Sequence, residues 1–262
     1  MIGLEQIKNF FPSQIRDVSV FEKYMLKEYL QLKVLDYLSS TPYIQQITFI
    51  GGTYLRLIKG IDRFSEDLDF DCKHLNEAAF IEMTDGIVQF LKRSGFRAET
   101  RESKNPKLTA FRRSIYFPEL LFNLGLSGHR EERFLIKIES QDQGIPYEPI
   151  MLNIKGCGFF FPFPVPTDSV VCSMKIAALL NRAKGRDFYD LMFLLPQTKP
   201  DYGFLLKECG IHNFKELKVA VSMLLNKIDL KKKQKDFEHL LFNRANSEKI
   251  LRFSDFINSF PE

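Results

Sequence analysis

One short segment constrains the fold of this chain more than any other. From Leu68 to Cys72 apolar and acidic side chains alternate, which is the period of a strand with one face in the core. Asp67 and Asp69 therefore project side by side from the outer face. Two carboxylates so placed can hold a hard divalent cation between themselves and the phosphates of a nucleotide. A solvated strand edge has the same pattern, so the pair alone leaves both interpretations open.

A glycine motif precedes this strand. A β-rich run over residues 44–50 ends at Gly51, Gly52 and Thr53, and a helical stretch follows over residues 54–58. Backbone amides at the start of such a helix can receive phosphate oxygens. A glycine pair also serves a simple tight turn. Because Asp67 and Asp69 follow, phosphate binding is favoured over a simple turn.

The remaining segments predict an α+β fold with two lobes. The proline-rich stretch 158–166 cannot form a regular helix, because proline lacks an amide proton and restricts its predecessor. We place the lobe boundary there, with residues 1–160 as a mixed sheet covered by helices and residues 161–262 as a mainly helical lobe. The expected helices of the first lobe cover residues 20–39 and 76–93, and its further strands cover residues 96–102, 108–116 and 134–139.

The second lobe begins with two consecutive helices. Residues 169–183 have helical spacing, Gly185 interrupts them, and a helix restarts over residues 187–195. The apolar residues that follow indicate a helical bundle. A basic run over residues 231–235 can contact RNA, although short charge runs are usually solvated.

A third carboxylate stands on another predicted strand. Lys137 and Glu139 share one strand face, while Ile136 and Ile138 share the other. Glu139 is therefore a candidate third metal ligand beside the first pair. An exposed alternation of lysine and glutamate on an ordinary strand is the other interpretation.

Basic residues cluster in the second lobe. Lys175 and Arg182 fall on one helical face, so both can converge on a triphosphate, and Arg186 follows close behind. Asp187 opens the next helix and is a further candidate. Its alternative role is a helix cap or an ion pair with Arg182 or Arg186, and a solvated helix face explains the cations equally well.

Composition narrows the class of protein. The 262 residues hold 37 Lys and Arg against 33 Asp and Glu, a net charge of +4, which permits nucleic-acid binding without requiring it. Four widely separated cysteines build neither a zinc site nor a redox pair, and reduced thiols are typical of the cytoplasm. The sequence has no signal peptide and no apolar stretch long enough to span a membrane, so we expect a cytoplasmic protein.

The order and spacing of these motifs resemble the AbiEii/AbiGii toxin family. The resemblance rests on Lys175 and on segments 51–53, 63–70, 137–139 and 182–191, and it extends over residues 44–195. One departure from the wider polymerase-β pattern is that the glycine motif ends in threonine rather than serine and stands further from the acids.

The resemblance implies a polymerase-β-like nucleotidyltransferase fold, dependence on Mg²⁺ or Mn²⁺, and a nucleoside triphosphate donor. Members of the family act as toxins in abortive infection and toxin–antitoxin pairs, and some add nucleotides to the 3′ end of tRNA. The resemblance implies that Asp67 and Asp69 bind the metal, that Lys137 and Glu139 support the site, that Lys175 and Asp187 complete it, and that Ser65 contacts phosphate. With the residue-level candidates, the predicted metal ligands are Asp67, Asp69 and Glu139. The predicted catalytic set adds Lys137, Lys175 and Asp187, and the predicted nucleotide-binding set is Gly51, Gly52, Thr53, Ser65, Arg182 and Arg186.

The functional hypothesis is transfer of a nucleoside monophosphate from an NTP to an acceptor hydroxyl, with RNA and especially the tRNA 3′ end as acceptor. The expected partners are the NTP, the RNA and a cognate antitoxin, and no membrane. The sequence leaves two other hypotheses open. One is kinase-like phosphoryl transfer to a protein or small molecule, and the other is a nucleotide-binding interaction module without turnover.

Overall fold

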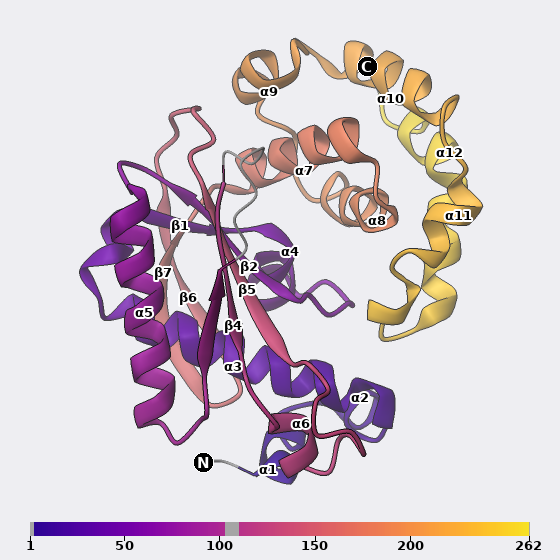
Figure 1. Cartoon of the computed structure of the whole chain (residues 1–262). Coiled ribbons are helices and arrows are strands. Elements are labelled where there is room, and N and C mark those ends of the chain that lie inside the picture. The colour runs from indigo at the N-terminus through magenta and orange to yellow at the C-terminus, as the bar shows by residue number, and fades with distance from the viewer. Residues whose placement is uncertain (1–2, 103–109, 262) are drawn as a thin grey trace. The chain divides into compact units, whose positions relative to one another are not determined.

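A computed structural model describes residues 3–102 and 110–261 of the chain (Figure 1). The start of the strand predicted at 108–116 lies outside the described residues. The chain forms two compact units, which are described separately. The first consists of Met1–Gly60, Phe64–Gln143 and Pro149–Val165, and the second of Ile61–Arg63, Gly144–Glu148 and Pro166–Glu262.

A five-stranded mixed sheet is the centre of the first unit. Its strand order is β1-β2-β5-β4-β3, and β2 and β5 are parallel whereas the other neighbours are antiparallel. The predicted α+β class and the mixed sheet are confirmed. The strands are β1 (Ile47–Ile50), β2 (Asp67–Cys72), β3 (Glu99–Glu102), β4 (Phe111–Tyr116) and β5 (Leu135–Gln141).

Two long helices pack in this unit, α3 (Glu22–Ser39) and α5 (Glu77–Arg93), and both were predicted. The Asn76 side chain accepts a hydrogen bond from the Ala79 amide at 2.9 Å, which caps α5 as its sequence indicates. Most of α3 is buried, including Glu28, whose carboxylate binds Arg56 at 2.7 Å. The shorter helices are α1 (Leu4–Lys8), α2 (Ser13–Arg16) and α6 (Leu120–Asn123), with 3-10 turns at Ser19–Phe21 and Pro42–Gln45.

The segment after β1 is helical from its first glycine. Helix α4 (Gly51–Tyr54) starts directly at the strand end, and a π-helical turn, Leu55–Lys59, continues it to Gly60. The predicted order of strand, glycine motif and helix is confirmed. The glycines are the first turn of the helix rather than a turn that precedes it.

The proline-rich stretch forms a strand that the sequence analysis missed. Strand β6 (Ile150–Gly156) pairs with β7 (Phe159–Val165) in an antiparallel hairpin. Pro162 and Pro164 stand two residues apart, so their missing amides face the same side of β7 and the ladder with β6 survives on the other side. The absence of helix there was predicted correctly, but the hairpin was not.

The second unit is mainly helical. Its first helices are α7 (Asp168–Arg182) and α8 (Gly185–Leu194). The prediction that Gly185 interrupts the helices is wrong, because Gly185 begins α8 and Ala183 ends α7 with a left-handed φ of 46°. A Cβ at position 185 would lie 1.9 Å from the carbonyl oxygen of Lys233, which explains the glycine. The later elements are α9 (Tyr202–Cys209), α10 (Phe214–Leu225), α11 (Leu230–Lys235), α12 (Phe253–Asn258) and the 3-10 segments Glu238–Leu240 and Arg244–Arg252.

Two further observations concern the cysteine thiols and the apolar length of the helices. All four cysteines are free thiols, and burial raises the pKa of Cys157 and of Cys172 to about 12. Within residues 3–102 and 110–261, no helix is both long and apolar enough to cross a membrane.

Candidate active site

The predicted carboxylates lie on two adjacent parallel strands. Asp67 on β2 is the register partner of Lys137 on β5, and Asp69 is the partner of Glu139. Leu68 and the isoleucines on either side of Lys137 are buried, so the polar residues share the opposite face of the sheet. The structure therefore brings Asp67, Asp69, Lys137 and Glu139 together. Lys137 Nζ lies 4.0 Å from Asp67 Oδ1.

The glycine motif packs directly on the second acid. A Cβ at Gly51 would lie 2.1 Å from Asp69 Oδ2 and 2.7 Å from Asp69 Cβ, and Gly51 has a φ of +86°. Only glycine permits this close approach and this backbone conformation without strain. The carboxylate of Asp69 is thus held against Gly51 at the start of α4, and Gly52 is the next residue of that helix.

Thr53 and Ser65 have structural partners inside the first unit. The buried Thr53 hydroxyl donates to the backbone carbonyl of Asp67 at 2.5 Å, which ties α4 to the start of β2. Ser65 is buried, and its carbonyl accepts a hydrogen bond from the Gln31 side chain at 3.2 Å. Both residues therefore support the loop and strand that carry the acids.

Glu139 is engaged by an arginine that the sequence analysis did not select. Arg112 on β4 stands opposite Glu139 in the antiparallel register. Its Nη2 donates to Glu139 Oε2 at 2.8 Å, and its Nε lies 2.7 Å from Oε1. The hydrogen bond to Glu139 raises the pKa of Arg112, and the charges of Glu139, Asp67 and Asp69 add to this rise against a lowering by burial.

The three carboxylates fit a divalent cation by chemical type and by register. Carboxylate oxygens are the ligands that Mg²⁺ and Mn²⁺ prefer, and Glu139 is the cross-strand neighbour of Asp69. Within the described part of the chain, no three acidic, histidine or cysteine side chains are gathered closely enough to hold an ion. The oxygens of Glu139 are directed to Arg112 instead.

A buried ion cluster surrounds Lys175 in the second unit. Lys175 Nζ donates to Asp190 Oδ2 at 2.8 Å, and the guanidinium of Arg63 donates to both oxygens of Asp190, also at 2.8 Å. Arg63 and Asp190 are fully buried. Burial alone would raise the pKa of Asp190, but the charges of Arg63 and Lys175 outweigh it and hold that pKa below its ordinary range.

Asp187 caps a helix and holds Arg182. Arg182 donates to both Asp187 oxygens at 2.8 and 3.0 Å, and the Lys184 amide donates to Oδ2 at 3.0 Å. This matches the alternative role considered for Asp187, a cap with an ion pair. Lys175 and Arg182 bind two different aspartates, and Arg186 is partly exposed in the first turn of α8.

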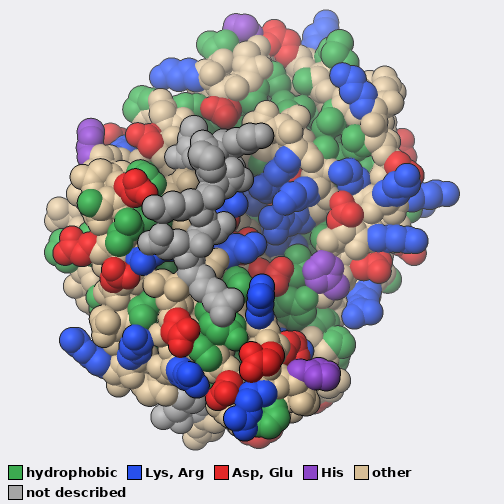
Figure 2. Space-filling model, in the orientation of Figure 1, with side chains coloured by type: hydrophobic (Ala, Val, Ile, Leu, Met, Phe, Trp, Pro, Cys, Tyr) green, Lys and Arg blue, Asp and Glu red, His purple; other side chains and the backbone are tan. Residues whose placement is uncertain are grey.

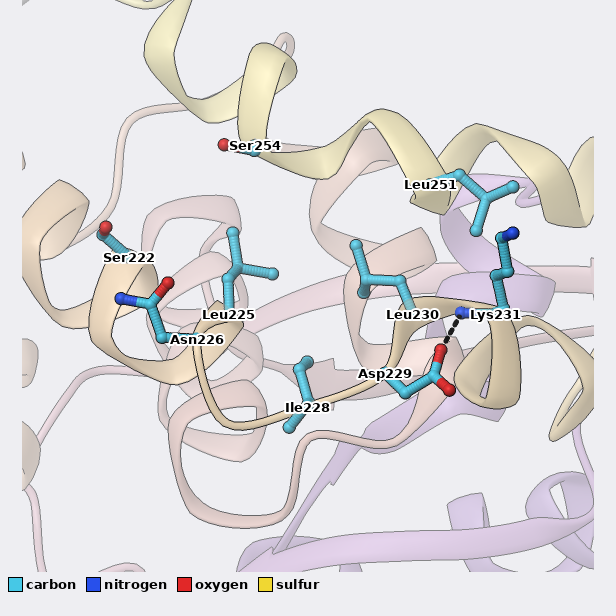
Figure 3. A pocket seen from close by; sticks show the side chains of 9 residues that line it. All are labelled: Ser222, Leu225, Asn226, Ile228, Asp229, Leu230, Lys231, Leu251 and Ser254. Carbon is cyan, nitrogen blue, oxygen red and sulfur yellow. Dashed lines mark hydrogen bonds between the residues drawn. The ribbon is translucent and has the colours of Figure 1, made fainter.

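A groove of about 560 Å³ lies elsewhere in the second unit (Figure 3). Leu225, Ile228 and Leu230 give it an apolar lining where α10 ends and α11 begins, and Asp229 accepts a hydrogen bond from the Lys231 amide at 2.9 Å. None of the predicted site residues, all of which the structure describes, lines this groove. The full lining is Ser222, Leu225, Asn226, Ile228, Asp229, Leu230, Lys231, Leu251 and Ser254.

The sequence analysis missed Arg112, Asp190 and Arg63. Alternation on β4 could show that Arg112 and its neighbour face opposite sides, but only the strand order shows which side carries the acids. Asp190 follows Asp187 by three residues on one helix, so spacing alone does not select the partner of Lys175.

The mixed sheet with paired acids on one face is a nucleotidyltransferase fold. The family model described as nucleotidyl transferase AbiEii toxin, type IV toxin–antitoxin system, matches residues 33–249. The chain belongs to this family, which confirms the predicted resemblance, and it is a nucleotidyltransferase toxin.

Solved structures agree with the fold. MenT4, a nucleotidyltransferase toxin from Mycobacterium tuberculosis, is similar with a TM-score of 0.64 at 18% identity, over 100% of this chain and 91% of that chain. JHP933 from Helicobacter pylori is similar with a TM-score of 0.53 at 19% identity, over 90% of this chain and 91% of that chain. No curated protein matches the sequence.

Proposed function

We propose that this toxin transfers a nucleoside monophosphate from an NTP to a hydroxyl of RNA, with the tRNA 3′ end as the favoured acceptor. The observation that carries the proposal is the placement of Asp67, Asp69 and Glu139 on one face of adjacent strands. The acceptor oxygen forms a bond to the α-phosphorus, the bond to the bridging oxygen breaks, and pyrophosphate leaves while the hydroxyl proton passes to solvent.

A divalent cation, Mg²⁺ or Mn²⁺, is part of this proposal. Asp67, Asp69 and Glu139 would hold it, and when bound it lowers the charge on the phosphates and favours the ionised acceptor hydroxyl. Gly51 leaves the space in which the Asp69 carboxylate lies, and Lys137 balances the charge of Asp67. The chain's own groups thus orient the ligands and set their charge.

The charge distribution supports an RNA acceptor. Residues 166–262 hold 16 Lys and Arg against 12 Asp and Glu, whereas residues 1–165 hold 21 of each. Figure 2 shows Lys and Arg side chains interspersed with Asp and Glu over most of the face displayed. A modest basic excess in residues 166–262 suits contacts to a phosphate backbone, so we expect RNA binding to weaken steeply with salt. The family implies a cognate antitoxin as a further partner, and we propose a cytoplasmic location for both.

The second unit supplies the proposed triphosphate contacts. Lys175, Arg182 and Arg186 are proposed to bind the triphosphate, and Asp187 to hold Arg182 in place. Arg182→Gln is expected to raise the KM for the NTP while Mn²⁺ affinity stays unchanged. Arg244→Gln, which removes the same charge from an exposed side chain, is the matched control. Equal KM values for the two variants would contradict the role of Arg182.

The central test is incubation of the purified chain with total tRNA, Mg²⁺ and each α-³²P-labelled NTP in turn. Asp69→Asn is compared with Asp17→Asn, which makes the same change at a side chain that is 64% exposed. We expect label in tRNA with the wild type and Asp17→Asn, and its loss with Asp69→Asn and with EDTA.

The same assay separates the alternatives. Entry of a γ-³²P label into a protein or small molecule would support phosphoryl transfer instead. NTP binding without label transfer and without pyrophosphate would support a binding module. Unchanged transfer by Asp69→Asn would refute the role of the acid pair.

A further inference from the structure

One row of side chains crosses three strands of the sheet on the face that carries the acids. Asp69 on β2 is paired in register with Glu139 on β5, and Glu139 is paired with Arg112 on β4. Neighbouring strands lie about 4.8 Å apart, so Glu139 stands between an acid on one side and a guanidinium on the other. Its carboxylate can be directed toward either neighbour by rotation of its own side chain.

In the structure Glu139 is directed toward Arg112. Arg112 Nη2 donates to one oxygen of Glu139 at 2.8 Å, and Nε lies 2.7 Å from the other. The Nε group is buried, yet within the described residues it has no acceptor in hydrogen-bond alignment. The ion pair is therefore close but incompletely satisfied, and the two side chains are 33% and 24% exposed, which leaves water access to both.

The charges around Arg112 also indicate that Arg112 and a divalent cation would compete for the same carboxylates. The nearby carboxylates of Glu139, Asp67 and Asp69 all favour the charged guanidinium. Arg112 thus partly neutralises the same three acids that a divalent cation would neutralise. Two cations that share one set of anions repel each other and compete for the ligand that both can reach.

We propose that Arg112 is a positioning residue that holds Glu139 away from Asp69 until a divalent cation displaces it. Glu139 then exchanges the guanidinium for the metal, and Arg112 sets the metal affinity of the site. This inference rests on the proposed function in one respect, that Asp67, Asp69 and Glu139 bind a divalent cation.

The first test measures Mn²⁺ binding by the electron paramagnetic resonance signal of free Mn²⁺, without NTP or RNA. Arg112→Gln removes the competing charge, so we expect Mn²⁺ to bind about tenfold more tightly, which corresponds to about 1.4 kcal/mol. Arg112→Lys keeps the positive charge but loses the two-pronged guanidinium contact with Glu139. Its Mn²⁺ affinity is expected to lie between those of the wild type and Arg112→Gln. A merely structural role for Arg112 predicts weaker binding in both variants.

The matched control is Arg97→Gln. It removes one positive charge from the same unit, at a side chain that is 66% exposed and 3.5 Å from Glu119. Its Mn²⁺ affinity is expected to equal that of the wild type. If Arg112→Gln binds Mn²⁺ no more tightly than Arg97→Gln, the inference is overturned while the metal site stands. If Mn²⁺ binds the wild type and Asp69→Asn equally, the proposed metal site itself fails.

A second test uses the wild-type chain and needs no folded variant. Phenylglyoxal modifies accessible guanidinium groups, and mass spectrometry of the peptides reports each arginine separately. Release from Glu139 should make Arg112 react several times faster when saturating Mg²⁺ is present, whereas Arg97 should react at one rate throughout. Slower or unchanged labelling of Arg112 with Mg²⁺ would overturn the exchange.

Discussion

Replacing Gly51 with alanine tests whether the glycine motif serves the acid pair. The φ of +86° at this position costs an alanine about 1–2 kcal/mol. Gly60, in the same unit, has a φ of +74° and nothing within 4 Å of an added Cβ. Gly60→Ala therefore carries a similar backbone strain without any clash, and the difference between the two variants isolates the contact with Asp69.

The size of that difference follows from the distances. The added Cβ at Gly51 would lie 2.1 Å from Asp69 Oδ2, and real Cβ contacts are essentially never under 3.0 Å, so the carboxylate must move by about 1 Å. A new rotamer alone does not relieve the clash, because Asp69 Cβ lies 2.7 Å away. A displacement of about 1 Å in a reacting group costs about 100-fold in rate.

The assay is nucleotide transfer to tRNA with saturating Mg²⁺, beside Mn²⁺ affinity and urea denaturation. We expect Gly60→Ala to lose about 1–2 kcal/mol of unfolding free energy, and Gly51→Ala to lose more because it adds the clash with Asp69. Only Gly51→Ala is expected to lose about 100-fold in transfer rate and to bind Mn²⁺ more weakly. Equal transfer rates for Gly51→Ala and Gly60→Ala would refute the view that glycine is required here to place Asp69.

Four further predictions concern the framework. Asp190→Asn leaves Arg63 and Lys175 buried without an anion, so thermal unfolding should show a loss of about 3–5 kcal/mol, against under about 0.5 for the exposed Asp255→Asn. Because the pKa of Asp190 is lowered from its ordinary 3.8, this stabilisation is present above pH 3.8 and lost as the pH falls below it, which acid titration of both proteins checks. Asn76→Ala should cost about 1 kcal/mol in urea denaturation, since it removes the cap of α5. Burial and a pKa of about 12 should keep the Cys172 thiol unreactive toward a disulfide reagent at pH 8 until urea unfolds the chain.

Local periodicity predicted the elements that carry the acids. The alternation after Asp67 and around Lys137 placed each polar residue on one face, because the side-chain period of a strand is two whatever it pairs with. The register that sets Asp69 beside Glu139 depends on β2 and β5 being parallel neighbours, although about 65 residues separate them in the chain. The sequence of neither strand alone shows that β2 and β5 are parallel neighbours.

The misses have similar causes. The prolines of the stretch 158–166 excluded a helix, and the sequence analysis went no further. The strand β7 forms there because Pro162 and Pro164 face away from β6, with which β7 pairs, so their missing amides cost no hydrogen bond of that ladder. Gly185 was read as an interruption because glycine usually ends helices. It is instead the first residue of α8, where the carbonyl of Lys233 leaves no room for a side chain. In both cases the deciding contact comes from elsewhere in the chain.

The charges on the acid face constrain how a donor can bind. Asp67, Asp69 and Glu139 carry three negative charges, and Lys137 and Arg112 carry two positive ones, so the face is anionic before any metal binds. A nucleoside triphosphate is repelled by such a surface at close range. A divalent cation reverses the sign of this local charge and, by displacing Arg112 from Glu139, also frees a guanidinium for the phosphates. We therefore expect the cation to bind before the triphosphate or together with it, so that binding of the NTP at this face is lost when EDTA removes the metal.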